Sequence, residues 1–385
     1  RMEQFQYSEA INCLEFCEQW GIDTLETHFL KARIYRKTGK FDEFEKSLAK
    51  SGSLGLPKPR LENEKLLLRG QSGNLSKLFA ALENLAGGVN QFDPPEIYEA
   101  MVNGLLLQGR FNEATEYIDH WAKDFPGDPR QRFYHAVLLI RFGPIRKIKG
   151  AQEKAAEILQ ALIQEYPNHY QAVMAYGDLL FATNQIEAAA IQFENCRTHP
   201  DAGIQAVSSL ARCYTNLGRL EEAKGLFKSV LETNPYDDFA RAELGKLQFN
   251  DEEFEEALKN LESSYPKRKW DFDLANSLAR TLEVFGKTDR AKELFDQANQ
   301  IREKLAIVQN LMEEVDLKDD EDKRYELGKM LLEYGDPETG IIYLSSIRDS
   351  NPLHQGAKKA LDDYYAKKNK KNPQFPTPIG PQQNP

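Results

Sequence analysis

Four basic side chains recur along the second half of the chain, one in each predicted repeat, and each could bind an anion. They are Arg212, Lys246, Arg280 and Lys329, at steps of 34, 34 and 49 residues. Three asparagines lie four residues before or after one of these cations, which places them on the same face of a helix. They are Asn216, Asn250 and Asn276. Arginine can bind a carboxylate through two parallel hydrogen bonds and asparagine can pair with a peptide backbone, so this set suits an extended, acidic peptide.

The same cations have a plainer interpretation as solvated surface charge. Carboxylates stand in the same or the next predicted helix, among them Glu243, Glu283 and Glu326. An exposed ion pair of this kind contributes only about 0–1 kcal/mol to stability. Both interpretations, a binding stripe and structural charge, stay open at this point.

Catalytic signatures are absent from the sequence. It contains no nucleophile elbow, no zinc-protease motif, no phosphate-binding glycine loop and no dinucleotide fingerprint. The six histidines are scattered. We expect His135 to be packed in the core, and His169 and His199 to cap helices or face solvent. The sequence therefore predicts a protein that is not an enzyme, with no cofactor and no evident small-molecule substrate.

Two clusters resemble metal sites and are better explained otherwise. Cys13 and Cys17 are one helical turn apart, but no second pair or nearby histidine completes a zinc site, so we expect buried thiols. The acidic run from Asp316 to Asp322 lacks the mid-loop glycine of a calcium loop. We expect it to form the first turn before a helix over 321–334, where carboxylates favour the positive helix end. No metal site is predicted.

A small residue marks the elements that must position these side chains. The register residues Ala155, Ala189, Ala223, Ala257 and Ala291 are each 34 residues apart. A fixed step of this length indicates stacked, similar units, because each unit must bury its apolar face against the next. In one such unit, Gly218 separates two segments with apolar residues at helical spacing, and Pro235 blocks the end of the second. Each unit is therefore predicted to be a helical hairpin.

With its small residues in both helices, this unit resembles the tetratricopeptide repeat (TPR) family. The small sites of the first helices are Ala32, Ala136, Gly177, Ala211, Gly245, Ala279 and Gly328. The resemblance covers roughly residues 5–352. It implies an all-α solenoid whose first helices line a concave groove, with the residue after each small site facing that groove. The four cations occupy this position in successive repeats, so the resemblance implies a groove that binds a protein or peptide.

The register also predicts the organisation of the chain. Residues 1–20 should form a half repeat consisting of a second helix alone, and residues 21–352 a superhelix of about nine hairpins. The longer step after Ala291 predicts a long helix from about Ala291 to Asp316. Residues 353–370 should form a capping helix, which hides the apolar end of the stack. The Pro-rich composition of 371–385 predicts a disordered tail.

Composition excludes some classes of partner. The net charge of −10 argues against a general nucleic-acid binder, which needs a basic surface to neutralise phosphates. No apolar run is long enough to span a bilayer. The chain begins with Arg1 rather than Met, so we expect a signal, anchor or catalytic domain upstream. The localisation, cytoplasmic or extracytoplasmic, depends on that segment.

The function predicted from these observations is a non-catalytic scaffold or adaptor that holds a partner in its groove. Two alternatives remain: the TPR region of a larger enzyme, and a purely architectural oligomerisation module. The stretch from Arg324 to Tyr365 also resembles bacterial, planctomycete-like multi-repeat TPR proteins. That resemblance implies a β-propeller protein as one possible partner.

Overall fold

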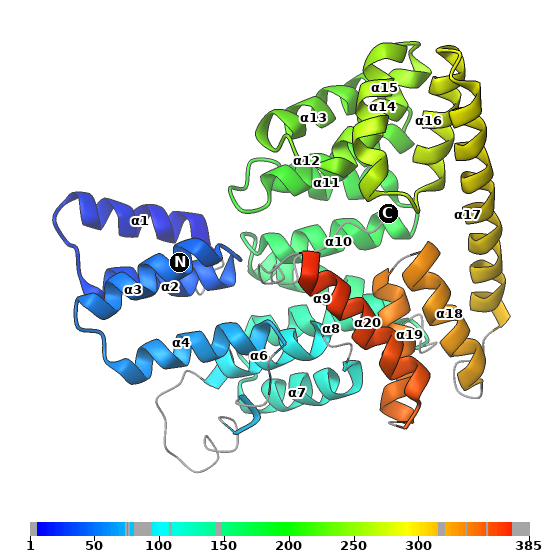
Figure 1. Cartoon of the computed structure of the whole chain (residues 1–385). Coiled ribbons are helices and arrows are strands. Elements are labelled where there is room, and N and C mark those ends of the chain that lie inside the picture. Colours follow the sequence, from blue (N-terminus) through cyan, green and yellow to red (C-terminus); the bar gives the residue numbers. More distant parts are fainter. Residues whose placement is uncertain are drawn as a thin grey trace. The chain divides into compact units, whose positions relative to one another are not determined.

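The chain is an all-α solenoid built from helical hairpins, as its repeat predicts (Figure 1). The computed structural model describes residues 6–73, 75, 78–80, 94–107, 110–143, 148–314, 320–335, 337–351 and 353–371. Within these residues every regular element is a helix. The helices form two compact units: unit 1 combines Arg1–Ala175 with Ser345–Asn384, and unit 2 is Tyr176–Leu344.

Unit 1 contains helices from both ends of the chain. They are α1 (Tyr7–Gln19), α2 (Leu25–Lys37), α3 (Phe41–Ser53), α4 (Lys58–Gln71), α6 (Pro94–Leu107), α7 (Phe111–Asp124), α8 (Pro129–Phe142), α9 (Ala151–Glu165) and α20 (Gln355–Lys371). The division between the units falls inside two further helices. They are α10 (Tyr170–Ala182) and α19 (Pro337–Ser350).

Unit 2 consists of consecutive helices. They are α11 (Ile186–Cys196), α12 (Gly203–Asn216), α13 (Leu220–Thr233), α14 (Asp238–Asn250), α15 (Phe254–Ser264), the short η2 (Tyr265–Lys267), α16 (Phe272–Val284), α17 (Thr288–Glu314) and α18 (Glu321–Tyr334). The predicted long helix is confirmed by α17, which has 27 residues. The predicted helix over 321–334 is α18.

Small residues allow the two helices of a hairpin to approach closely. The five register alanines, from Ala155 to Ala291, have no exposed surface. Glycines on the first helices show how little room remains opposite. A Cβ atom on Gly245 would lie 2.9 Å from Cγ of Leu261, and one on Gly177 would lie 2.7 Å from Cε1 of Phe193. Any larger side chain at these positions would overpack the contact, which explains the 34-residue step.

The turn inside a hairpin needs a residue with positive φ. Gly218 and Gly286 take φ values of 73° and 70°, which glycine adopts without a steric penalty. Two equivalent turns lack glycine, and there Asn184 and Glu252 take φ values of 60° and 63°. The turn conformation is therefore imposed by helix packing as well as by the turn residue itself.

Side-chain caps begin several of the first helices. The Asp237 carboxylate accepts a hydrogen bond from the Ala240 backbone N–H at 2.9 Å, and that of Asp271 accepts one from Leu274 at 3.0 Å. Each cap satisfies a backbone donor that has no partner within its own helix. These caps set where α14 and α16 start.

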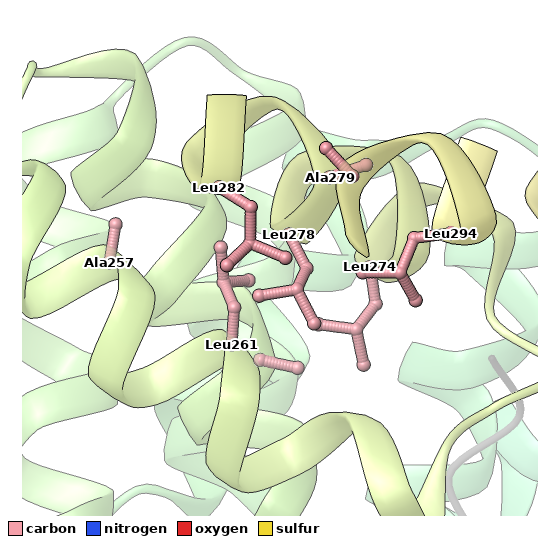
Figure 2. Close-up of a cluster of buried hydrophobic side chains, with 9 residues drawn as sticks. Ala257, Leu261, Leu274, Leu278, Ala279, Leu282 and Leu294 are labelled. Carbon is pink, nitrogen blue, oxygen red and sulfur yellow. The ribbon is translucent and has the colours of Figure 1, made fainter. Parts of the chain in front are cut away.

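Leucines fill the contact between neighbouring hairpins. Figure 2 shows side chains of α15, α16 and α17 meeting, with Leu261, Leu278 and Leu282 at the centre. These three leucines are fully buried. Burying one such side chain contributes about 1.5–3 kcal/mol. This cluster therefore holds α16 and α17 firmly against the preceding repeat.

The C-terminal helix packs within unit 1. The Tyr365 hydroxyl of α20 donates a hydrogen bond to the Leu107 carbonyl oxygen at the end of α6, at 2.6 Å. Ala357 and Leu361 on the same helix are buried. Of the predicted tail, residues 371–385, Lys371 ends α20 and residues 372–385 lie outside the described residues. The proposed domain limits at residues 20, 352 and 370 stay a prediction.

Candidate partner-binding groove

The predicted groove cations lie on four first helices of unit 2, in three different environments. Arg212 on α12 is half-buried, and its guanidinium carbon lies 4.6 Å from the ring centroid of Phe181 and 5.6 Å from that of Phe239. Both distances are within the range of a cation–π interaction. No carboxylate among the described residues pairs with Arg212.

Lys246 on α14 agrees with the interpretation of these cations as structural charge. Its Nζ atom lies 2.6 Å from Oε1 of Glu243, one turn earlier on the same helix. The charge of Lys246 is therefore compensated locally.

Arg280 and Lys329 are exposed and rest on aromatic rings. Arg280 on α16 lies 4.8 Å from the ring centroid of Phe249, and Nζ of Lys329 on α18 lies 5.3 Å from that of Tyr325. The predicted partners Glu283 and Glu326 pair with neither cation in the part of the chain that the structure describes.

The three predicted asparagines are separated by the structure. Asn216 is exposed, and its Nδ2 atom donates a hydrogen bond to the Arg212 carbonyl oxygen at 3.0 Å. Asn250 is exposed on α14 and Asn276 is half-buried on α16. Of the three asparagines, Asn216 alone borders the cavity described next.

A cavity of about 550 Å³ lies against the first helices of unit 2. This volume falls within the range of about 300–1,000 Å³ typical of ligand pockets. Its lining residues are Phe181, Arg212, Thr215, Asn216, Phe239, Glu243, Lys246, Arg268, Trp270, Asp271, Phe272, Asp273, Leu305, Tyr334 and Gly335. The structure thus brings Arg212, Asn216 and Lys246 together, and leaves Asn250, Asn276, Arg280 and Lys329 outside the cavity.

Arginines and aromatic rings alternate along the cavity wall. Arg268 lies 5.2 Å from the ring centroid of Phe239 and 5.1 Å from that of Trp270. With the two contacts of Arg212, this gives an arginine–aromatic series that runs Phe181, Arg212, Phe239, Arg268 and Trp270. Arg268 is held in place by Asp271, whose Oδ2 atom lies 2.8 Å from its Nη2 atom. Of the two arginines, Arg268 has a carboxylate partner and Arg212 has none among the described residues.

Sequence reasoning missed Arg268 and Trp270. Both lie in the connection between α15 and α16, whereas the prediction followed one register position on each first helix. The signal available was local: three basic residues and a tryptophan directly precede Asp271, which caps α16. The aromatic partners Phe181 and Phe249 each precede their arginine by 31 residues. The prediction did not use this 31-residue spacing either.

In unit 1 the first helices are joined by buried ion pairs. Arg36 on α2 has 1% of its surface exposed, and its Nε and Nη2 atoms lie 2.8 Å from Glu64 and 2.5 Å from Glu96. Glu96 also lies 2.8 Å from both Lys37 and Arg130. We call these five residues the unit 1 ion network. They connect α2, α4, α6 and α8.

The electrostatics of this network favour its ionised form. Burial alone would raise the pKa of Glu96, but the charges of Lys37, Arg36 and Arg130 hold it well below its usual value. Arg33, at the groove position of α2, lies 3.5 Å from Glu64 and Glu96. The charges on this face of unit 1 are thus compensated within the protein.

Several aromatic residues of unit 1 belong to its core. Tyr98, Phe133 and Tyr134 are buried. The Tyr98 ring stacks on Trp121 with centroids 6.1 Å apart, and its hydroxyl donates a hydrogen bond to Asp124 at 2.6 Å. These contacts fix the hairpin of α6 and α7.

The structure contradicts the predictions for two residues. Cys13 is exposed rather than buried. His135 is exposed on α8, since its neighbours Tyr134 and Ala136 take the buried side. For His169 the solvent-facing alternative is wrong: the residue directly precedes α10 and is buried at 2% exposure against Phe133, and burial lowers its pKa to about 3.

Two further cysteines, Cys196 and Cys213, are buried, and burial raises their pKa to about 11 and about 12. The predictions for His199 and for the start of α18 are confirmed. The Nδ1 atom of His199 accepts a hydrogen bond from the Asp201 backbone N–H, so His199 caps a turn. The Asp320 carboxylate caps α18 by accepting a hydrogen bond from the Lys323 N–H at 2.9 Å, while Asp316 and Asp319 lie outside the described residues.

One group of potential metal ligands was not noticed in the sequence. Ligand atoms of Glu18, Asp23 and His28 lie within 4.8 Å of one another. Nζ of Lys31 lies 2.7 Å from Glu18, and His28 contacts both carboxylates. These contacts account for the cluster as an ion-pair group that joins α1 to α2.

None of the described helices is both long and apolar enough to cross a bilayer.

Family models for the tetratricopeptide repeat match residues 25–51, 133–169, 153–196 and 208–235. The chain is similar to tetratricopeptide repeat protein 21B of Xenopus laevis, at 23% identity over 273 residues, covering 70% of this chain and 19% of that protein. It is also similar to tetratricopeptide repeat protein 21A of Mus musculus, at 21% identity over 302 residues, covering 77% and 21%. The chain thus spans about a fifth of the length of these relatives.

Among solved structures, the chain is similar to Pseudomonas aeruginosa pilF, at 15% identity and a TM-score of 0.48. The match covers 54% of this chain and 91% of that one. Because both sequence relatives are vertebrate proteins, the bacterial type expected from the sequence stays a prediction.

Proposed function

Because the chain is a tetratricopeptide-repeat protein, we propose that it is a non-catalytic scaffold that holds an extended, acidic segment of a partner protein against the first helices of unit 2. Proteins of this family are generally non-catalytic and serve protein interactions. The observation that carries the acidic character of the partner is Arg212, a cation that borders a cavity and has no carboxylate partner among the described residues.

The proposed contact surface consists of the predicted groove residues. They are Arg212, Asn216, Lys246, Asn250, Asn276, Arg280 and Lys329. Arg212, Arg280 and Lys329 rest on aromatic rings, which orient the cations without neutralising them. A partner carboxylate could therefore approach each cation without displacing an internal carboxylate. The β-propeller partner implied by the bacterial resemblance stays a prediction.

Unit 2 is favoured over unit 1 because of how each unit compensates its charges. In unit 1 the first-helix cations Arg36 and Lys37 are already paired with the buried carboxylates of Glu64 and Glu96. A ligand would have to break those pairs, at a cost of several kcal/mol for the buried carboxylates left behind. In unit 2 no such exchange is needed at Arg212.

The experiment reverses the four cations together. The protein with Arg212→Glu, Lys246→Glu, Arg280→Glu and Lys329→Glu is compared with wild type on an array of random ten-residue peptides. One half of the array is rich in Asp and Glu, and the other half carries Asn and Gln at the same positions. We expect wild type to prefer the acidic half and the variant to lose that preference.

A control variant carries the same change in net charge elsewhere on unit 2. It reverses four exposed lysines on second helices and turns. They are Lys228, Lys259, Lys287 and Lys292. If this control loses the preference for acidic peptides as fully as the groove variant does, a general charge effect explains the binding and the proposed groove is wrong. Wild type without any preference for the acidic half would also overturn the proposal.

A further inference from the structure

The cavity in unit 2 distinguishes Arg212 from every other cation that lines it. Lys246 is paired with Glu243 at 2.6 Å, and Arg268 is paired with Asp271 at 2.8 Å. Arg212 contacts two aromatic rings instead. The cavity therefore offers one guanidinium whose charge is not compensated by a described carboxylate.

The rings beside Arg212 leave its hydrogen-bond donors available. The five N–H groups of a guanidinium lie in its plane. Phe181, at 4.6 Å, and Phe239, at 5.6 Å, contribute ring carbons and no oxygen that could accept a hydrogen bond from these groups. Two parallel N–H donors of a guanidinium match the two oxygens of a carboxylate.

Another part of the cavity wall is apolar. Phe272 comes from the first turn of α16, Leu305 from the middle of α17 and Tyr334 from the end of α18. Each of these side chains is only half-buried. Covering them with an apolar side chain would remove more of their surface from water, at about 25 cal/mol per Å².

We propose that this cavity binds one acidic residue of the partner segment together with an adjacent bulky apolar residue, and that Arg212 binds the carboxylate. This inference rests on the proposed function, since it takes the ligand to be a protein segment. It goes further by concentrating recognition in one cavity. It also includes Arg268 and Trp270, which position Phe239 and thereby Arg212 through the arginine–aromatic series.

The charge balance of the cavity supports recognition at a single point. The lining has three cations and three carboxylates, the third carboxylate being the exposed Asp273. The lining as a whole therefore carries no net positive charge. Binding should depend on the placement of one carboxylate at Arg212, with a weak dependence on salt compared with a stripe of four cations.

The test uses peptides with random flanks around a fixed central pair. Three sets carry Glu-Phe, Gln-Phe or Glu-Ala at the centre, and binding is measured by fluorescence anisotropy. We expect wild type to bind the Glu-Phe set best. Arg212→Gln should weaken that binding by about 10- to 100-fold and remove the preference for Glu over Gln. Phe272→Ala should reduce the preference for Phe over Ala.

The control is Arg219→Gln. Arg219 also lies in unit 2 and rests on an aromatic ring, that of Tyr214 at 3.8 Å, but it belongs neither to the cavity nor to the proposed contact surface. We expect this variant to leave binding unchanged. Arg280→Gln is a comparison within the contact surface: Arg280 occupies the equivalent position two repeats after Arg212 but lies outside the cavity, so this change should weaken binding less than Arg212→Gln does. Circular dichroism of all four variants checks that the helices are retained.

The outcomes separate this inference from the function on which it rests. If Arg212→Gln and Arg280→Gln weaken binding equally, the groove binds acidic segments along its length and the single-cavity anchor is wrong. If wild type binds Gln-Phe peptides as well as Glu-Phe peptides, Arg212 does not select a carboxylate. If none of the three sets binds, both the anchor and the proposed peptide-binding function are overturned.

Discussion

Replacing Arg36 with methionine should destabilise unit 1 far more than the loss of a surface charge. Arg36 is 1% exposed and contacts Glu64, Glu96 and Gln71. Methionine fills part of the space but leaves buried carboxylates with fewer cations. Removing one partner of a buried pair typically costs about 3–5 kcal/mol. Because Glu96 keeps Lys37 and Arg130, we expect a loss near the lower end, about 3 kcal/mol.

The matched control is Arg60→Met. Arg60 pairs with Glu26, but both side chains are largely exposed, so the expected loss is about 1 kcal/mol or less. A loss of 3 kcal/mol in a unit of this size should lower the melting temperature by about 6–12 °C. Thermal unfolding gives this shift, and hydrogen exchange of the α2, α4 and α6 amides locates the loss within unit 1.

A double variant tests the cause directly. Adding Glu64→Gln to Arg36→Met removes the carboxylate that keeps only Arg33, at 3.5 Å, as a cationic partner among the described residues, so the double variant should be more stable than the sum of the single losses predicts. If Arg36→Met costs no more than Arg60→Met, or if the two substitutions are simply additive, the buried-charge explanation is refuted.

Three further predictions concern pH and packing. Because the pKa of Glu96 is lowered in the folded protein, ionised Glu96 stabilises the folded state above its unfolded pKa of about 4.5. This stabilisation is lost as the pH falls below that value. Urea midpoints between pH 3 and 6 should therefore drop steeply for wild type and less for Glu96→Gln. Burial lowers the pKa of His169 from 6.5 to about 3, so below pH 6.5 the unfolded state binds a proton at His169 that the folded state does not bind. The free energy of unfolding should therefore decrease by about 1.4 kcal/mol per pH unit below 6.5. His169→Leu should flatten the profile between pH 6.5 and 4.5, whereas the exposed His135→Leu should not; equal slopes would contradict the assignment. Gly245→Ala should cost about 1–3 kcal/mol by overpacking, whereas Gly225→Ala, with open space around it on α13, should stabilise by about 0.5–1 kcal/mol in the same urea titration; similar effects at both positions would argue against the steric explanation of the repeat.

The fold could be predicted because its determinants are local and repeated. Ala223 and Ala257 sit where two helices of one hairpin touch, and the turn residue Gly218 stands five positions before Ala223. Helix contacts between neighbours in sequence follow from spacing alone. Long α17 was predictable for the same reason, since its additional residues lengthen the step after Ala291.

The candidate site could be predicted only in part. Register placed Arg212, Asn216 and Lys246 on one face of successive first helices, and they do line one cavity. The repeat step in the sequence does not predict which other residues complete the wall of that cavity. Leu305 and Tyr334 reach it from helices that are distant in sequence.

The unit 1 ion network illustrates the same limit. Arg36 pairs with Glu64 and Glu96, which are 28 and 60 residues away. Neither separation is a multiple of the repeat step. Such pairs depend on how tightly successive hairpins curve, and spacing in the sequence carries no information about that curvature.

The hydrogen bond from Tyr365 to Leu107 imposes an order on how the polypeptide can acquire its structure. Unit 2 is encoded between the two parts of unit 1, so all of its residues leave the ribosome before α20 does. Domains generally fold as units during synthesis. The middle of the chain can therefore finish folding while the first part of unit 1 still waits for α20, so the synthesis of α20 is the step that completes unit 1.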